Sequence, residues 1–371
     1  MADPEIRGGK TPRDVRKHPM PEPPPEAKRP ERNIRLQKIM TALTRLLPCA
    51  AFAMLACAPQ ICAAKAEADK TDFDRELGEC VAAMKRLPPS PADTPGRRKI
   101  FEALDALLQR DISGNAQAER EFSKAVDVRY SAAADEILSG LEKKPNGKLS
   151  VWKGYNMGFA VRGPQGASAG IDLSFEWGRG RDIDEARAER LAERLDILLV
   201  THEHGDHFSR NLIRAMLKAG KPVISPSLEI IGNSCGKDGI TVLHGADGEA
   251  NFGGIKLRIF AGSQMTSKTT SIPCNVYLLD IGGAKILHNG DNTDQSVYKD
   301  AGNADIALAN CWSGFSELIR HARPSLVIPG HESELNHRGS GRKRFLSSYE
   351  WFERNGHPAP IVMFMGESIS R

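Results

Sequence analysis

The chain has 371 residues, of which 40% are hydrophobic, so it is long enough to bury one large core or two ordinary ones. Its formal net charge is +4, and this charge is unevenly distributed. Residues 1–66 hold twelve Lys and Arg against six Asp and Glu, a net charge of +6, so residues 67–371 carry a net −2. This near-neutral remainder gives no electrostatic case for a nucleic-acid partner.

The first 66 residues have the composition of a leader that does not join the folded domain. Residues 1–33 combine Pro and charge, as in MPEPPPEAKRPER, which is typical of disorder. A basic stretch and an apolar run over 46–64 follow in the order of an export signal, and residues 64–66 (AKA) offer a cleavage site. The alternatives are a membrane-anchoring helix and, loosely, a lipoprotein box ending at Cys57. We predict an exported, periplasmic protein, with a membrane tether through the N-terminus as the alternative.

Four cysteines remain outside this leader, at positions 80, 235, 274 and 311. Their spacing resembles neither a zinc knuckle nor a CxxC redox pair. An oxidising compartment would permit one disulfide, whose pairing the sequence does not specify. Four buried free thiols are the alternative.

Residues 67–146 are predicted to be a helical segment. Apolar residues recur at three-to-four spacing between 70 and 142, with few β-branched residues. PPSPADTPG at 88–96 and SGN at 113–115 separate the helices. The segment contains no histidine cluster, glycine-rich loop or nucleophile motif, so we expect it to pack on the catalytic domain or to form a partner surface.

Residues 147–371 are predicted to form an α/β layered domain. Short apolar runs such as DILLV, AKILHNGD and SLVIPGH end in polar residues, and amphipathic stretches such as DEARAERLAERL separate several of them. The run LLVTHEHGDHF, at 198–208, places three histidines and two acids directly behind one such strand.

The spacing of these titratable residues predicts metal binding. His202 and His204 are two residues apart, so in extended backbone both imidazoles face one side and can share a cation. Asp206 and His207 follow Gly205, which permits a sharp turn that aims them at a second cation. Neutral imidazoles with a carboxylate suit Zn²⁺, and also Mn²⁺ or Fe²⁺.

THEHGDH resembles the signature of the metallo-β-lactamase-fold hydrolases, and the resemblance covers about residues 148–371. It implies a four-layer αβ/βα sandwich with a site for one or two metals between its sheets. Asp172 in AGIDLSF matches the family's acidic residue that buttresses the metal loop. Asp291 in ILHNGDNTD matches the carboxylate that bridges the metals, and His331 in VIPGH matches the last ligand. The implied ligands are His202, His204, Asp206, His207, Asp291 and His331.

One ligand that the resemblance implies is missing. The family usually supplies another histidine before the bridging aspartate, whereas residues 245–287 contain none. Ser263 or Gln264 occupies the approximate position, and a Gln264 amide oxygen or a water are alternatives for filling the gap. The second site therefore matches fully and the first is weakened. Two interpretations stay open, an atypical binuclear centre or one metal held mainly at the second site.

Three further histidines are weaker candidates for a role in the site. His244 follows an apolar run and offers an alternative replacement for the missing ligand. His288 lies three residues before the bridging aspartate and is predicted to orient the site from behind the ligands. His337 follows the last ligand closely and is a candidate general acid or substrate-binding residue.

The predicted chemistry is hydrolysis by a metal-bound hydroxide, because such metals lower the pKa of bound water to about 7. Asp206 or Asp291 would bind this hydroxide and act catalytically. The bridging carboxylate resembles the lactonase, phosphodiesterase and thioesterase branches more than true β-lactamases, so we predict a phosphoester, ester or lactone in a small or lipid-like molecule. The alternative is a non-catalytic or decayed binding protein. The oligomeric state is not indicated.

Overall fold

The computed structural model describes residues 72–371, apart from 93, 176–181, 247 and 333–342. The predicted leader, with its export signal and its anchoring alternatives, lies outside these residues, and so does His337. Among the residues that are described, no helix combines the length and the apolar character needed to cross a membrane.

Three helices open the described chain: α2 (Asp72–Arg86), α3 (Thr94–Leu108) and α4 (Ala116–Glu142). Asn115 caps α4, since its side-chain oxygen accepts a hydrogen bond from the backbone N–H of Ala118 at 3.1 Å. The apolar faces of the three helices share one buried cluster, which also includes Phe345 and Phe364 from the end of the chain. The helical segment therefore packs on the domain that follows.

Two β-sheets follow the helices. In the described residues the first sheet has seven strands, in the order β13-β1-β2-β3-β4-β5-β6, and the second has six, in the order β12-β11-β10-β9-β8-β7. The strands of the first sheet are β1 (Ser150–Lys153), β2 (Phe159–Arg162), β3 (Ser168–Ile171), β4 (Ile197–Leu199), β5 (Val223–Ser225), β6 (Ile240–Val242) and β13 (Ser368–Ser370). Those of the second are β7 (Ala250–Phe252), β8 (Ile255–Met265), β9 (Ser271–Ile281), β10 (Ala284–His288), β11 (Ile306–Asn310) and β12 (Leu326–Gly330).

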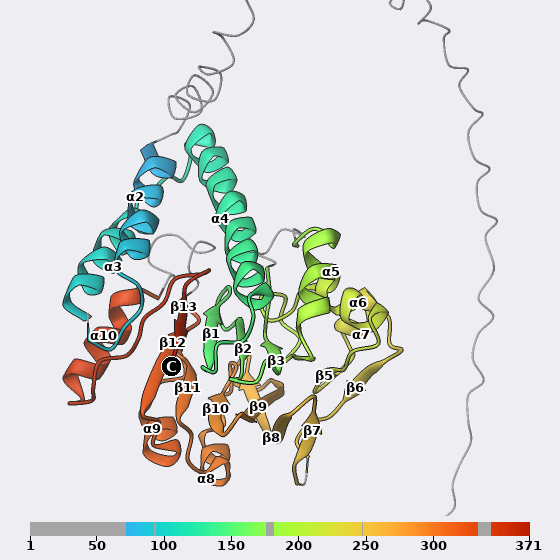
Figure 1. Cartoon of the computed structure of the whole chain (residues 1–371). Helices are drawn as coiled ribbons and strands as arrows, with labels where there is room; N and C mark the ends of the chain where they lie inside the picture. Colours follow the sequence, from blue (N-terminus) through green and yellow to red (C-terminus); the bar gives the residue numbers. More distant parts are fainter. Residues whose placement is uncertain (1–71, 93, 176–181, 247, 333–342) are drawn as a thin grey trace, which may run out of the picture. The chain divides into compact units, whose positions relative to one another are not determined.

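The remaining helices cover the outer faces of the sheets. They are α5 (Glu185–Arg194), α6 (Arg210–Lys218), α7 (Ile231–Cys235), η1 (Gln295–Val297), α8 (Tyr298–Ala301), α9 (Ser316–Ala322) and α10 (Phe345–Arg354). One apolar cluster lies between the sheets, a second joins the first sheet to α4, α5 and α6, and a third joins the second sheet to α8, α9 and α10. Figure 1 shows these helices on the outside of the strands. The predicted four-layer αβ/βα sandwich, preceded by helices, is confirmed.

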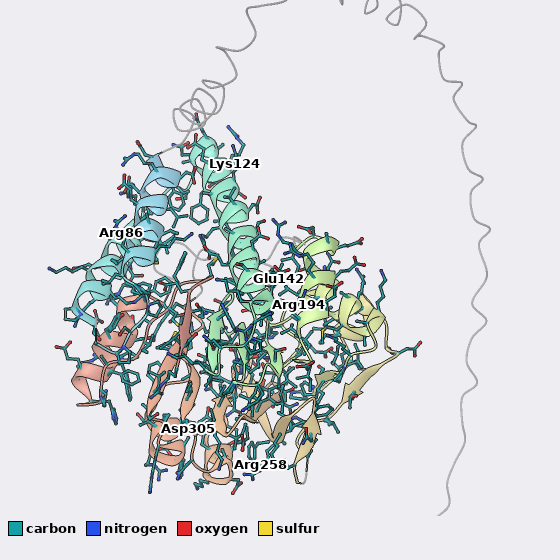
Figure 2. All side chains as sticks on the ribbon, viewed as in Figure 1. Arg86, Lys124, Glu142, Arg194, Arg258 and Asp305 are labelled. Atoms are coloured by element: carbon teal, nitrogen blue, oxygen red, sulfur yellow. The ribbon has the colours of Figure 1, made fainter. Side chains whose placement is uncertain are left out.

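The ends of α4 and α5 lie side by side against the first sheet. Figure 2 shows this contact near the labelled Glu142 and Arg194, and the Arg190 guanidinium donates to the Glu142 carboxylate at 2.6 Å. The helices and the sheets belong to one compact unit, Ala68–Arg371. The boundaries that we place at residues 66 and 146 therefore stay predictions.

Parallel pairing brings the polar strand ends together. Strands β3, β4, β5 and β6 pair in parallel, and so do β10, β11 and β12. Parallel strands present their carboxyl ends at the same sheet edge, which is where ligands bind in open α/β sheets. Asp172 and Thr201 follow β3 and β4, while Asp291 and His331 follow β10 and β12. The topology thus gathers residues that lie up to 159 positions apart.

The four cysteines of the described chain are all free thiols. Cys274 and Cys311 are buried, whereas Cys80 and Cys235 are partly exposed. The predicted alternative of four buried thiols is therefore correct for two of them only.

A buried ion pair fastens α3 to the end of the chain. The Arg97 guanidinium donates to both carboxylate oxygens of Glu367, at 2.9 and 2.6 Å, and also to the carbonyls of Leu87 and Val362, at 2.6 and 3.0 Å. Its side chain is only 2% exposed. Because removing one partner leaves a buried charge unpaired, Arg97→Ala should lower the free energy of unfolding by about 3–5 kcal/mol.

Urea unfolding followed by far-UV circular dichroism measures this loss. Arg98→Ala is the matched control, because Arg98 is exposed and its ion pair with Glu353 contributes little. Equal stability of the two variants would contradict the role that we assign to Arg97.

Candidate metal centre

The loop between β4 and α6 carries four of the predicted ligands. His202 and His207 are completely buried, whereas His204 and Asp206 are partly exposed. The backbone N–H of His207 donates to the carbonyl of His204 at 2.9 Å, which closes the turn. Gly205 does not have a positive φ, and a Cβ added to it would meet nothing within 4 Å. The prediction that this turn requires a glycine at position 205 is therefore wrong.

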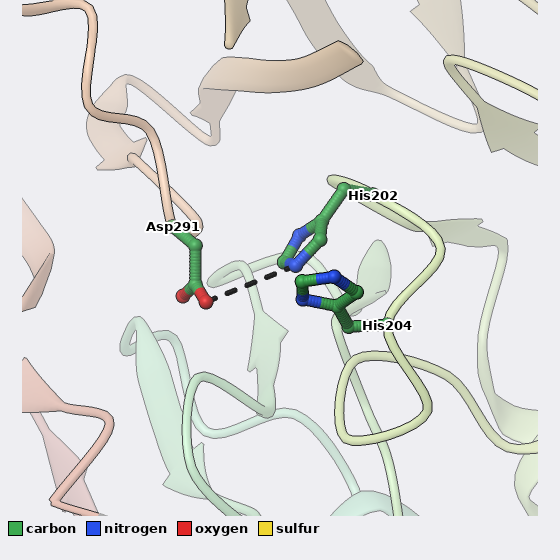
Figure 3. A group of neighbouring side chains, drawn as sticks. All are labelled: His202, His204 and Asp291. Carbon is green, nitrogen blue, oxygen red and sulfur yellow. Dashed lines mark ion pairs between the residues drawn. The ribbon is translucent and has the colours of Figure 1, made fainter. Parts of the chain in front are cut away.

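The six predicted ligands form two adjacent groups. The ligand atoms of His202, His204 and Asp291 all lie within 4.8 Å of one another, and those of the other three, Asp206, His207 and His331, do the same. Figure 3 shows His202 and His204 on one loop, facing the Asp291 carboxylate across the site.

Asp291 lies between the two groups. Its Oδ2 is 3.8 Å from Nε2 of His202 and 3.1 Å from Nε2 of His331, and its Oδ1 is 3.4 Å from Nε2 of His207. One carboxylate thus faces imidazoles of both groups. This is the position that the resemblance implies for a bridging ligand.

Asp172 is hydrogen-bonded to the ligand loop from the end of β3. It is completely buried, and its carboxylate accepts hydrogen bonds from the N–H and the hydroxyl of Thr201, at 2.7 and 2.6 Å. It also lies 2.8 Å from Nδ1 of His207. With the proton of His207 on Nδ1, Nε2 is left to face the centre. The contacts agree with the buttressing role that the resemblance implies.

Three amide side chains orient the carboxylates, and two of them were missed in the sequence. Asn156 donates to Oδ2 of Asp206 at 2.9 Å, and Asn310 donates to Oδ1 of Asp291 at 2.6 Å. Gln264, which the sequence did indicate, donates to Oδ2 of Asp291 at 3.0 Å. Asn310 could have been found in the sequence, because it is the polar residue that ends an apolar strand, as several of the predicted ligands do.

The weaker candidates contact backbone or other side chains. His288 is buried, and its Nε2 lies 2.8 Å from the Met157 carbonyl while its Nδ1 accepts from the Gly290 N–H at 3.2 Å. His244 lies 3.2 Å from the Asn275 side chain and belongs to neither of the two groups of ligand atoms found among the described residues. Its side chain is therefore not directed at the first group in this structure. Of the two replacements considered, Gln264 rather than Ser263 directs a side-chain contact to the site.

The residues present fit a bound cation. Nε2 of His202, of His207 and of His331 is buried and has no hydrogen-bond partner among the described residues. Buried polar atoms in native proteins are nearly always paired, so three orphaned nitrogens around two carboxylates require an explanation. A divalent cation accepts lone pairs from all of these groups, and imidazoles with carboxylates suit Zn²⁺, Mn²⁺ or Fe²⁺.

Burial and the neighbouring carboxylates shift the imidazoles in opposite directions. Burial lowers the pKa of His202 to about 3, which keeps this imidazole neutral, as a metal ligand must be. For His331 burial also disfavours the charged form, but the Asp291 and Asp206 carboxylates outweigh it and raise the pKa to about 10. The same balance raises the pKa of His207 well above its usual value. Without a cation, the imidazoles of His207 and His331 are therefore protonated at neutral pH.

We expect cation binding to release protons from His207 and His331. Because the pKa of His331 is raised to about 10 and that of His207 well above its usual value in the metal-free protein, protons compete with the cation for both imidazoles at neutral pH. The apparent affinity should therefore fall as the pH falls, by about tenfold per pH unit for each displaced proton. Calorimetric titration with Zn²⁺ in buffers of different ionisation enthalpy counts the protons, and binding without proton release at pH 7 would contradict this expectation.

Comparison with known proteins places these residues in a family. Residues 158–331, which include all six predicted ligands, match a family model described as a β-lactamase superfamily domain. A UPF0173 metal-dependent hydrolase from Salinibacter ruber is 29% identical over 157 residues, which cover 37% of this chain and 66% of its own length. A UPF0173 protein from Pyrococcus furiosus is 26% identical over 160 residues, which cover 40% of this chain and 70% of its own.

Solved structures with a similar arrangement have low sequence identity. A metallo-β-lactamase-fold protein from Bacillus subtilis is 13% identical, with a TM-score of 0.44 over 61% of this chain and 100% of its own. The metallo hydrolase Igni18 from Ignicoccus hospitalis is 15% identical, with a TM-score of 0.44 over 60% of this chain and 98% of its own. Residues 158–331 thus match a β-lactamase superfamily domain, and this match, the metal-dependent hydrolase relatives and the order of the site residues support the metallo-β-lactamase-fold hydrolase superfamily.

Proposed function

We propose that this hydrolase cleaves a phosphoester, ester or lactone bond in a small or lipid-like molecule. The observation that carries the proposal is the position of Asp291, whose carboxylate faces imidazoles of both ligand groups at 3.1–3.8 Å. A carboxylate shared in this way supports two adjacent cations, or one cation beside a proton acceptor. The family supports an enzyme, and with all six ligands present the alternative of a decayed binding protein is set aside.

The chain's own residues prepare the site for hydrolysis. A bound Zn²⁺, Mn²⁺ or Fe²⁺ would lower the pKa of water to about 7 and polarise the scissile bond. Asn156 and Asn310 each donate to one catalytic carboxylate, so Asp206 and Asp291 are fixed before a substrate arrives. Burial is outweighed by the imidazoles, which keep the pKa of Asp291 well below its usual range. Both carboxylates are thus ionised at neutral pH and can accept a hydrogen bond from the attacking water.

Several parts of the proposal rest on the sequence alone. Export to the periplasm, and a lipid or membrane tether as its alternative, are inferred from residues 1–66. A small or lipid-like substrate is inferred from the resemblance to the lactonase and phosphodiesterase branches, and the near-neutral charge of residues 67–371 argues against nucleic acid.

Metal depletion and restoration test the proposal. The full chain is stripped with a chelator and then supplied separately with Zn²⁺, Mn²⁺ or Fe²⁺, and each sample is assayed on a generic phosphodiester, an ester and a lactone. We expect hydrolysis of one bond class to disappear with the metal and to return with one of the three cations. His202→Ala should be inactive, while His321→Ala, which changes a histidine paired with Glu317 on α9, should retain activity. Full hydrolysis by metal-free protein would refute the proposal.

A further inference from the structure

The two ligand groups offer a cation different numbers of protein ligands. The second group combines Asp206, His207 and His331 with Asp291, whose oxygens lie 3.4 Å from His207 and 3.1 Å from His331. The first group contains only His202 and His204 besides the same Asp291. Zinc is usually four-coordinate in proteins, so the second group supplies a complete set and the first does not.

Gln264 lies beside Asp291, the carboxylate of the first group. It lies at the end of β8, and its Nε2 donates to Oδ2 of Asp291, the same oxygen that is 3.8 Å from Nε2 of His202. Its Oε1 is buried and has no hydrogen-bond partner among the residues that the structure describes. The amide therefore carries one unsatisfied oxygen close to Asp291 of the first group.

An amide oxygen is a poorer ligand here than an imidazole. Imidazole suits Zn²⁺, whereas neutral carbonyl oxygens suit harder cations such as Mg²⁺ and Ca²⁺. We therefore expect an amide oxygen to bind Zn²⁺ less tightly than an imidazole does. The N–H of Gln264 also engages a lone pair of Asp291 Oδ2, and His331 lies 3.1 Å from the same oxygen. Oδ2 of Asp291 thus faces Gln264, His331 and His202 at once, which weakens this oxygen as a ligand for the first group.

We propose that the two cation sites of the centre have unequal affinities and that Gln264 is the residue that causes the difference. One divalent cation binds tightly to Asp206, His207, Asp291 and His331. A second binds weakly and exchangeably to His202, His204 and Asp291, with Oε1 of Gln264 as its fourth protein ligand. This inference rests on the metal centre of the proposed function and concerns the affinities of its two halves.

Zinc titration of the metal-free full chain tests the inequality without an activity assay. In competition with a chromophoric chelator, the wild-type protein should bind one Zn²⁺ tightly and a second at least about tenfold more weakly, a difference of the size that ligand-shell changes produce. Gln264→His should tighten the weak phase by at least about tenfold. Met265→His is the matched control, because the next residue of β8 points to the opposite face and is 58% exposed.

Two ligand variants keep the inference falsifiable if Gln264→His does not fold. His204→Ala should remove only the weak phase, and His331→Ala should remove the tight phase. Two equally tight sites in the wild-type protein, or loss of the tight phase in His204→Ala, would overturn the inequality while leaving the metal centre intact. A protein that binds no Zn²⁺ at all would overturn the metal centre itself, and the inequality with it.

Discussion

Asp291→Ala is expected to lower kcat/KM for hydrolysis by at least about 10³-fold, because a positioned acid or base contributes about 10²–10⁴-fold and this carboxylate also holds the cations. In the structure Asp291 faces His202, His207 and His331 together. Its loss therefore removes the only carboxylate that the two ligand groups of the described chain share. Steady-state kinetics and metal content per chain, measured on the same preparation, check both effects.

Asp291→Asn separates charge from shape in the same position. It keeps the volume of the side chain but removes the negative charge between three imidazoles, so we expect a loss of activity close to that of the alanine variant. Asp300→Ala is the control, since this exposed aspartate lies nine residues further along the chain. Activity of Asp291→Asn within about tenfold of wild type would show that the carboxylate does not have the role given to it here.

Asp172→Ala is expected to lower the free energy of unfolding by about 3–5 kcal/mol, the cost of breaking a buried charged network. The completely buried carboxylate accepts from the N–H and hydroxyl of Thr201 and contacts Nδ1 of His207. The alanine variant would leave these groups unpaired in the interior. Urea unfolding at pH 7 measures the loss.

Asp172→Asn tests the orienting role of the same residue. The amide keeps an acceptor for the Thr201 N–H and tolerates the positive φ of 46° at this position. It does not provide the charge beside His207, so Zn²⁺ affinity should fall about 10–100-fold with a smaller loss of stability. Asp196→Ala, at the other end of β4, removes a carboxylate that accepts from the Ser168 N–H at 2.8 Å and should leave Zn²⁺ binding unchanged. Unchanged Zn²⁺ affinity in Asp172→Asn would contradict the orienting role.

The ligand residues could be predicted because each one follows a recognisable apolar strand. A buried strand must end in a residue that leaves the core, and parallel pairing brings such ends to one edge. His202, Asp291 and His331 all belong to this class. Their order along the chain matches the family motifs, which is why the sequence indicated both the fold and the candidate ligands.

The supporting residues could not be predicted in the same way. Asn156 lies in a short loop between β1 and β2, and its contact with Asp206 spans 50 positions of the chain. Asparagine in a glycine-rich loop is common, so its residue type alone carries little information. The choice between Ser263 and Gln264 depended on which face of β8 meets the site, and this required the pairing of β8 with β9.

The loop of residues 154–158 determines more of the centre than its lack of ligands suggests. Asn156 holds Asp206, the Met157 carbonyl holds His288, and a Cβ on Gly158 would come within 2.8 Å of the Asp172 carbonyl. One turn of the first sheet thus contacts Asp206 in the ligand loop, Asp172 beneath that loop and His288 at the end of β10. A hairpin that supplies none of the predicted ligands therefore takes part in positioning the ligand loop and Asp172. Lengthening this hairpin by one residue would displace Asn156, the Met157 carbonyl and Gly158 together without changing any predicted ligand residue.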